Sequence, residues 1–156
     1  MADIFVSYAK EDIERVRPLI EILEWQDWSV VWDYHLAHGE TRSDYIEEEL
    51  RAARCVVVVW TRTSVNRPRV LEEAEAADYR NVLIPVFMDP VEAPLGFGGV
   101  KGAWLGDWTG DPNDVDLVDL CWKVERRLKR ARRGGFMCRL PPSTPWWRAW
   151  WRGPSW

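Results

Sequence analysis

The most constraining feature of the sequence is an uninterrupted apolar run, CVVVVW, over Cys55–Trp60. Six consecutive apolar residues without polar alternation predict a strand that is covered on both faces. Strands of this kind belong to parallel sheets, because the helical crossovers between parallel strands pack on both faces of the sheet. We therefore expect this segment to be the central strand of a parallel sheet.

Strand-like and helix-like segments alternate along the rest of the chain. The predicted strands are Asp3–Ser7, Trp28–Trp32, Cys55–Trp60, Val82–Met88 and a short edge strand Gly102–Leu105, and the predicted helices are Glu11–Trp25, Arg42–Ala53, a third that ends near Tyr79, and Val115–Arg132. This alternation predicts an α/β fold with right-handed crossovers. We expect a flavodoxin-like three-layer sandwich, with a five-stranded parallel sheet in the order 2-1-3-4-5 and helices on both faces.

Local signals refine the helix boundaries. Pro18 lies inside the first helical pattern, where it should remove a hydrogen bond or bend the helix. Ser64 and Asn66 offer capping groups ahead of the third helix, and Pro68 suits an early helical position. Asn81 is expected to close that helix.

The predicted strand order also locates a candidate site. In open α/β sheets a ligand binds beyond the carboxyl ends of the strands, at the point where the strand order reverses. Here that point lies between the first and third strands. It singles out Ser7, Tyr8 and Ala9 after the first strand, and residues 61–73 after the third.

Glu73 is the sharpest chemical candidate near this point. With roughly 100° between successive helical residues, Val70, Ala74 and Ala77 mark the inward face of the third helix, Glu73 lies at the edge of that face, and Glu72 points the opposite way. A partly shielded carboxylate near a helix N-terminus suits the stabilisation of positive charge on a sugar whose glycosidic bond is breaking. Alternatively, Glu73 is one of several solvated glutamates in EEAEA. Without further information, the residues alone favour this second interpretation.

The sequence lacks the motifs of the common nucleotide-dependent and metal-dependent enzymes. It contains no GxGxxG or Walker loop, no HExxH, no GxSxG and no clustered cysteine ligands. His35 and His38 lie close to Asp33 without a third ligand, so we expect no metal site. The three cysteines are far apart, which predicts reduced thiols. No segment has the length and character of a membrane span or a secretion signal, and we expect a cytoplasmic protein.

Charge divides the chain into two parts. Residues 124–156 hold nine of the 21 Lys and Arg residues and one of the 25 acids, a net charge of +8, which leaves −12 for the rest. We predict one domain over residues 1–133 and a basic, Trp-rich tail over 134–156. The tail is expected to be disordered, to dock on its own domain or another copy, or to contact a membrane surface or partner. The acidic body makes nucleic acid an unexpected partner.

Four segments together resemble the TIR (Toll/interleukin-1 receptor) domain. They are DIFVSYAKED, similar to the first conserved box, WSVVWDYHLAHGE, similar to the second strand and BB loop, and IEEELRAARCVVVVWTRTS and RVLEEAEAADYRNVLIPVFMD, similar to the elements that follow in bacterial TIR proteins. Their order and spacing cover about residues 3–130. The resemblance implies a flavodoxin-like fold and, for the NAD-cleaving bacterial members, an N-glycosyl hydrolase.

The resemblance also implies functional residues. Glu73 holds the place of the family's catalytic glutamate, and the residues expected to contact substrate are Ser7, Tyr8, Ala9, Asp33, Gly39, Ser64 and Arg69. Arg69 departs from the family, because it occupies the position of a frequent tryptophan. Its guanidinium is expected to pair with an NAD phosphate or stack on a ring, or else to weaken catalysis. For Phe5 and Trp32 we favour core packing over ligand contact.

The implied function is that of an NAD+ glycohydrolase in bacterial immune or cell-death signalling. It releases nicotinamide together with ADP-ribose or a cyclic ADP-ribose, with NAD+ as substrate and no prosthetic group. Activity is expected on self-assembly with other TIR domains, where the BB loop of one copy helps to close the site of the next. One alternative is a non-catalytic TIR–TIR interaction module, and another is a different flavodoxin-like nucleotide binder that processes nucleosides.

Overall fold

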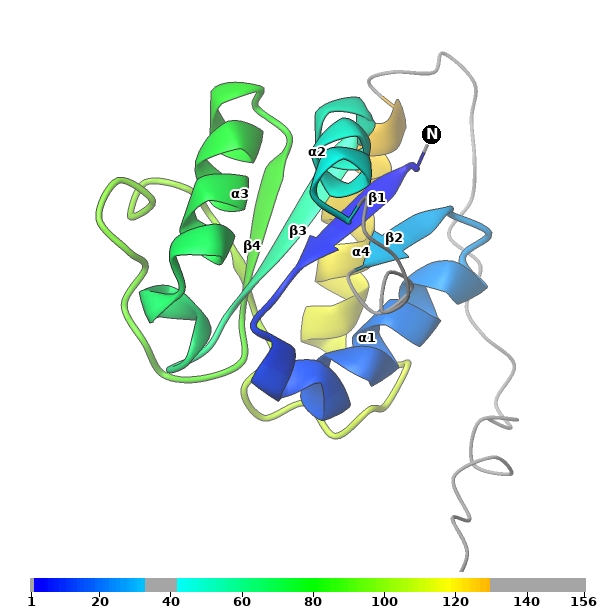
Figure 1. Ribbon diagram of the computed structural model, residues 1–156. Helices are drawn as coiled ribbons and strands as arrows, with labels where there is room; N and C mark the ends of the chain where they lie inside the picture. Colours follow the sequence, from blue (N-terminus) through cyan, green and yellow to red (C-terminus); the bar gives the residue numbers. More distant parts are fainter. Residues whose placement is uncertain (1, 33–41, 130–156) are drawn as a thin grey trace, which may run out of the picture.

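A five-stranded parallel sheet forms the centre of the molecule, in the order β2-β1-β3-β4-β5 (Figure 1). The computed structural model describes residues 2–32 and 42–129. Its strands are β1 (Ile4–Ser7), β2 (Val30–Trp32), β3 (Cys55–Trp60), β4 (Leu83–Phe87) and β5 (Ala103–Trp104). The predicted fold class and strand order are confirmed.

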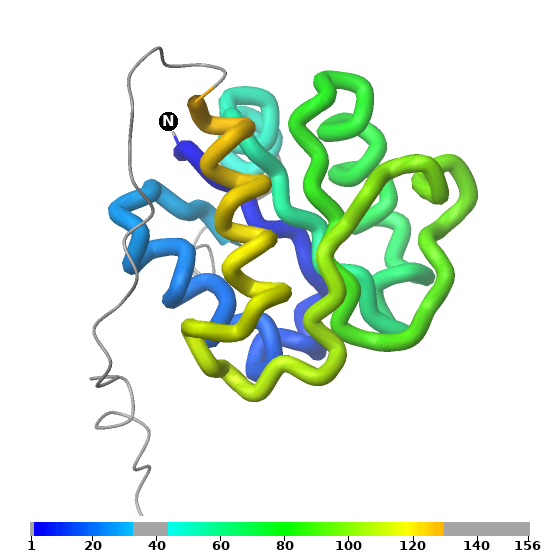
Figure 2. Tube along the Cα trace, turned by 180° about the vertical axis from the view of Figure 1, so that it is seen from behind, coloured from blue at the N-terminus to red at the C-terminus, as the bar shows by residue number. Residues whose placement is uncertain are grey.

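Helices cover both faces of this sheet. They are α1 (Ile13–Trp25), α2 (Arg42–Ala52), α3 (Pro68–Tyr79) and α4 (Val115–Lys129), with short 3₁₀ turns η1 (Lys10–Asp12) and η3 (Ser64–Asn66) ahead of α1 and α3. Helices α1 and α4 lie on one face of the sheet and α2 and α3 on the other (Figures 1 and 2). Their buried side chains form two separate cores, one on each face. The result is the predicted three-layer sandwich.

Alternate side chains of β1 and β3 point to opposite faces of the sheet and so contribute to both cores. Ile4 and Val6 point into the core under α1 and α4, whereas Phe5 points into the core under α2 and α3. Every residue of β3 is fully buried, which explains its unbroken apolar sequence. Burial of these apolar side chains stabilises the fold, since apolar burial contributes roughly 25 cal/mol per Å².

The structure corrects two local predictions. The first helix does not begin at Glu11, because η1 precedes α1. Pro18 lies inside α1, as the sequence pattern placed it. The predicted caps of α3 are wrong, since its N-cap is Arg67 without a side-chain capping bond. Pro68 is the first residue of α3, as predicted.

The C-terminal end of α3 follows the sequence signal. Asn81 has φ 58, the left-handed conformation that ends a helix, and asparagine tolerates it better than most residues. This residue turns the chain from α3 into β4, in line with the prediction.

Two of the three cysteines lie in the described part of the chain. Cys55 and Cys121 are buried free thiols, and burial raises the pKa of Cys55 to about 12, while Cys138 lies outside the described residues. Within residues 2–32 and 42–129, no helix has the length and apolar character needed to cross a membrane. The predicted domain boundary between residues 133 and 134 also lies outside those ranges.

Candidate active site

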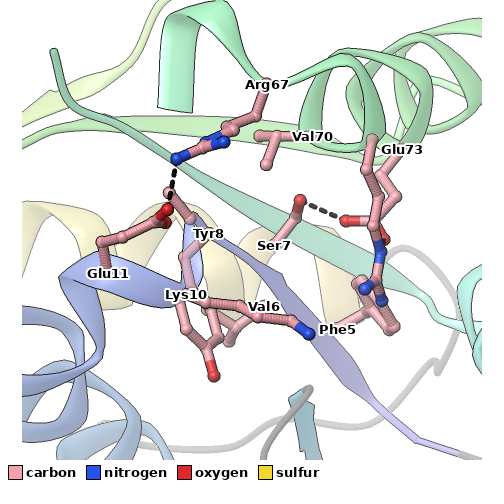
Figure 3. A pocket seen from close by; sticks show the side chains of 11 residues that line it. Phe5, Val6, Ser7, Tyr8, Lys10, Glu11, Arg67, Val70 and Glu73 are labelled. Carbon is pink, nitrogen blue, oxygen red and sulfur yellow. Dashed lines mark hydrogen bonds and ion pairs between the residues drawn. The ribbon is translucent and has the colours of Figure 1, made fainter. Parts of the chain in front are cut away.

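A pocket of about 170 Å³ lies beyond the carboxyl end of β1, where β1 meets α3 (Figure 3). We call it the Glu73 pocket. Its lining residues come from β1, from the turn after β1, and from the start of α3: Phe5, Val6, Ser7, Tyr8, Ala9, Lys10, Glu11, Arg67, Arg69, Val70 and Glu73. Because β1 lies between β2 and β3 in the sheet, this is the predicted switch point.

The Glu73 carboxylate accepts hydrogen bonds on both of its oxygens. The Ser7 hydroxyl, at the end of β1, donates to Oε2 (Figure 3). The Nε of Arg69, one helical turn earlier on α3, donates to Oε1 at 3.1 Å. The residue is 9% exposed, so the carboxylate is largely shielded from water while its two donors stabilise its negative charge.

The sequence of α3 explains why a carboxylate reaches this position. Val70, Ala74 and Ala77 are buried against the sheet, as the helical periodicity predicts. Glu73 lies beside them at the margin of the core, and Glu72 is exposed. The prediction that the two neighbouring glutamates differ in environment is therefore confirmed.

Three cations line the Glu73 pocket, and of these Arg69 alone was predicted from the sequence as a site residue. Lys10 and Arg67 line the pocket together with Arg69, and the Arg67 guanidinium forms an ion pair with Glu11 across the mouth (Figure 3). Lys10 and Glu11 directly follow the predicted Ser7-Tyr8-Ala9 segment, and Arg67 lies within residues 61–73. Their proximity to the switch point was the available signal.

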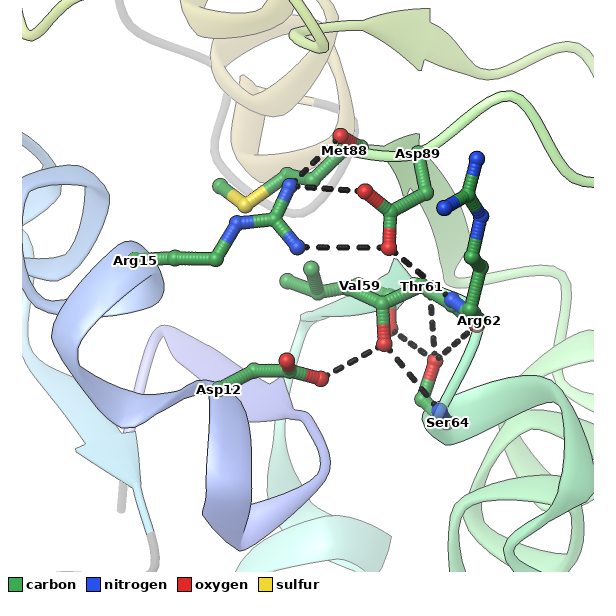
Figure 4. Close-up of polar contacts among 8 residues, drawn as sticks. All are labelled: Asp12, Arg15, Val59, Thr61, Arg62, Ser64, Met88 and Asp89. Atoms are coloured by element: carbon green, nitrogen blue, oxygen red, sulfur yellow. Dashed lines mark hydrogen bonds and ion pairs between the residues drawn. The ribbon is translucent and has the colours of Figure 1, made fainter.

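A network of polar contacts holds the turn after β1 against the ends of β3 and β4 (Figure 4). The Thr61 hydroxyl donates to the buried Asp12 carboxylate at 2.5 Å. The Arg15 guanidinium donates to both oxygens of Asp89, at 2.9 and 3.2 Å, and to the Met88 carbonyl at 2.7 Å. These contacts join η1 and α1 to the segments that follow β3 and β4.

The ionisation of the Arg15–Asp89 pair follows from this geometry. The hydrogen bonds from Arg15, chiefly, and one from the Arg62 backbone hold the pKa of Asp89 below its ordinary value of 3.8. The hydrogen bond to Asp89 likewise raises the pKa of Arg15. Both groups are therefore charged at neutral pH, as an Arg–carboxylate pair requires.

The structure brings most of the predicted site residues together. Ser7, Tyr8, Ala9, Arg69 and Glu73 all line the pocket. Tyr8 is also 9% exposed and packs in the core under α1 and α4, so it serves both the core and the pocket wall.

Ser64 is not among the described residues that line the pocket. Ser64 is fully buried, and its hydroxyl donates to the Val59 carbonyl at 2.7 Å and accepts from the Thr61 amide at 2.7 Å. These two hydrogen bonds stabilise the turn after β3, and the buried Ser64 hydroxyl is not open to a substrate. Asp33 and Gly39 lie outside the described residues, as do the two histidines.

Glu73 also borders a second, wider groove between α2 and α3. This groove has a volume of about 630 Å³ and is lined by Ile46, Glu47, Leu50, Arg51, Arg69, Glu72, Glu73 and Ala76. Its three glutamates outnumber its two arginines, so it is less suited to a phosphate than the Glu73 pocket is. Among residues 2–32 and 42–129, no group of three or more His, Cys, Asp or Glu side chains is arranged to hold a metal ion.

Comparisons with known proteins place this fold in a family. A family model for the TIR domain matches residues 4–129. The TIR domain of the Toll-related receptor TRR-2 from Hydra magnipapillata has 18% identity and a TM-score of 0.63, and the match covers 86% of this chain and 100% of that one. The TIR domains of the activated Roq1 resistosome, which recognises the pathogen effector XopQ, have 20% identity and a TM-score of 0.48 over 85% of this chain and 76% of that one.

The structural likeness concerns the fold, and a search of curated proteins found no match. The family model, in contrast, spans nearly all of the sheet and the helices around it, from the first residue of β1 to the last of α4. The chain therefore belongs to the TIR domain family.

Proposed function

We propose that this TIR domain is an NAD+ glycohydrolase that uses Glu73 to cleave the bond between nicotinamide and ribose. The observation that carries the proposal is the Glu73 carboxylate, largely buried on α3 and hydrogen-bonded to Ser7 at the switch-point pocket. A negative charge fixed in a shielded cleft acts most strongly on positive charge that develops during a reaction. Cleavage of a glycosidic bond develops such a charge on the sugar.

The chemistry follows from the charges of substrate and site. The bond between ribose C1′ and the pyridinium nitrogen breaks, and both electrons leave with the nitrogen, so that neutral nicotinamide departs. Glu73 accepts hydrogen bonds from the ribose hydroxyls and stabilises the oxocarbenium-like ribose. A water molecule then attacks C1′ and loses a proton to solvent, giving ADP-ribose. Attack by an adenine nitrogen instead gives the cyclic product.

The pocket walls support the placement of the nicotinamide ribosyl end there. Phe5 and Val70 provide apolar surface beside the carboxylate, and Lys10 and Arg67 provide positive charge at the mouth for a diphosphate. Binding of a diphosphate at Arg67 competes with its ion pair to Glu11. We expect that pair to open when substrate enters.

The size of the pocket supports a role for assembly. Pockets for whole drug-sized ligands are typically about 300–1,000 Å³, whereas the Glu73 pocket is about 170 Å³. The rest of a dinucleotide must therefore extend beyond it. A neighbouring copy, through its segment at residues 33–41, is the proposed source of the missing wall. In this proposal the protein acts in bacterial immune or cell-death signalling and becomes active on self-assembly.

A non-catalytic TIR–TIR scaffold is the second candidate. The observation that favours it is the Arg69–Glu73 ion pair, because the carboxylate oxygen that a ribose hydroxyl would need already has a partner within the chain. Arg69 also stands where the family frequently has tryptophan. The scaffold hypothesis predicts assembly without NAD+ consumption.

One experiment separates these candidates. Full-length protein is incubated with NAD+ at low and high protein concentration, with and without a crowding agent, while light scattering follows assembly and chromatography follows free nicotinamide. The enzyme hypothesis predicts nicotinamide release that rises more steeply than protein concentration as assembly begins, together with ADP-ribose or its cyclic form. Assembled protein that leaves NAD+ intact would instead establish the scaffold.

A further inference from the structure

A third concave surface lies at the opposite end of the sheet from the Glu73 pocket. It has a volume of about 510 Å³ and is lined by Leu83, Ile84, Lys101, Lys123, Arg126, Arg127 and Lys129. We call it the basic groove. It is formed where β4 begins and α4 ends, and the end of α4 lies near the start of β1 (Figures 1 and 2). The Glu73 pocket, in contrast, lies beyond the end of β1.

Every charged residue that lines the basic groove is positive. Lys123 pairs with Asp119 at 2.6 Å and Lys129 pairs with Glu125 at 2.9 Å, so part of the charge is neutralised from outside the lining. Lys101 and Arg126 form no ion pair with any residue that the structure describes. Their charge is therefore available to a ligand, in a protein whose body outside residues 124–156 carries −12.

The sequence that follows the basic groove is also rich in basic residues. Lys129, the last described residue, is itself a lining residue, so the chain leaves the described structure at the groove. Arg130, Arg132 and Arg133 come next, and the last 11 residues contain five of the chain's 12 tryptophans and two arginines. Clusters of four to eight basic residues favour anionic lipid headgroups, and tryptophan favours the boundary between water and bilayer.

We infer that the basic groove docks on the headgroups of an anionic membrane surface, with the Trp- and Arg-rich tail entering the same interface. The two features are adjacent in the chain and complementary, because the groove supplies electrostatic attraction and the tail supplies apolar side chains. Docking by this end turns the Glu73 pocket away from the bilayer. The site then remains open to a soluble substrate and to a neighbouring copy.

The test uses vesicle flotation with the full-length protein, on phosphatidylcholine vesicles with and without phosphatidylserine. Wild type is expected to float only with phosphatidylserine, and less at high salt. The Lys101→Glu/Arg126→Glu variant is expected to lose partitioning by about 25-fold or more, since each basic residue near an anionic surface contributes roughly fivefold. Arg62→Glu, at an exposed position beside the opposite end of the sheet, serves as the control and is expected to stay close to wild type.

Thermal unfolding of each variant is expected to give the wild-type Tm, because Lys101 and Arg126 make no ion pair with a described residue whose loss would destabilise the fold. The tail is unchanged in all variants, so a loss confined to Lys101→Glu/Arg126→Glu assigns docking to the groove. Equal flotation of that variant and wild type would overturn the proposal. Binding of wild type to a duplex oligonucleotide but not to phosphatidylserine vesicles would overturn it as well. None of these experiments measures nicotinamide release, so their outcomes do not depend on the proposed enzyme activity.

Discussion

Glu73 has two hydrogen-bond partners, and these differ in burial. Ser7 is almost fully buried at the end of β1, whereas the Arg69 side chain is 44% exposed at the rim. A buried hydroxyl that donates to a carboxylate oxygen holds that carboxylate in one orientation. Removal of the hydroxyl is costly, because it leaves the buried carboxylate oxygen without a donor. An exposed ion pair contributes little and opens readily. The two partners therefore predict different consequences when removed.

Ser7→Ala is expected to lower nicotinamide release by roughly ten- to a hundredfold, because a misplaced catalytic group costs rates of that order. The free energy of unfolding should fall by about 1–3 kcal/mol, the usual cost of leaving a buried polar group without its partner. Initial rates and chemical denaturation measure the two effects. Ser29→Ala, which removes an exposed hydroxyl in the turn before β2, is the matched control and should leave the rate unchanged. A Ser7→Ala enzyme with the rate of wild type would show that the hydroxyl does not position Glu73.

Arg69→Met keeps an apolar stem but removes the guanidinium from Glu73 Oε1. If the ribose hydroxyls need that oxygen, kcat/KM should rise by up to about fivefold, the equivalent of the roughly 1 kcal/mol at the upper end of the range for an exposed pair. Arg51→Met is the control, because Arg51 forms a more exposed i,i+4 pair with Glu47 on α2. A fall in kcat/KM for Arg69→Met, with KM raised, would show instead that Arg69 contacts the substrate.

At the scale of elements, the Arg15–Asp89 pair joins the start of α1 to the end of β4. The Arg62 backbone amide also donates to Asp89 at 3.0 Å, so the same carboxylate contacts both α1 and the loop after β3. Since the pKa of Asp89 is lowered in the folded protein, its contribution to stability is present above its ordinary value of 3.8. That contribution is lost as the pH falls through the lowered pKa.

Asp89→Asn should therefore destabilise the protein at neutral pH and not in acid. We expect a loss of about 1 kcal/mol at pH 7, equivalent to a Tm lower by about 2–4 °C in a chain of this size. The difference from wild type should shrink to zero once the pH is well below 3.8. Thermal unfolding across this pH range measures it, with the exposed Glu75→Gln as control. A difference that persists at low pH would mean that Asp89 acts through packing and not through its charge.

The elements were predictable because their signals are local. The unbroken run at β3, the helical spacing in α3 and Asn81 at its end each specify one conformation on their own. The capping role assigned to Ser64 failed for the opposite reason, since its hydroxyl bonds to Val59, a partner that only the turn after β3 brings near. The 3₁₀ turn η1 was also missed, because a short 3₁₀ turn and the first turn of an α-helix share the same sequence preferences.

At the scale of the whole molecule, the site was predictable as far as topology determines it. Strand order placed Ser7 near Glu73, 66 residues apart in sequence, because parallel strands end at one edge. For Lys10 and Arg67 the sequence indicated proximity to the switch point but not that their side chains line the pocket, since the direction of a long side chain in a turn depends on tertiary contacts such as the Arg67–Glu11 pair. The opposed ends of the sheet also separate the Glu73 pocket from the basic groove, a relation that no local pattern contains.

Two adjacent glutamates of α3 are expected to differ in function, because Glu73 is proposed to stabilise the transition state of NAD+ cleavage and Glu72 is not. The most direct measurement is the initial rate of nicotinamide release by assembled Glu73→Gln and Glu72→Gln, compared with wild type at equal assembly. Both substitutions remove one negative charge from adjacent positions on the same helix, but only Glu73 lies in the Glu73 pocket. We predict that Glu73→Gln loses at least about a hundredfold in rate, in line with the removal of one electrostatic stabiliser, while Glu72→Gln keeps the wild-type rate. Equal rates for the two variants would contradict the account.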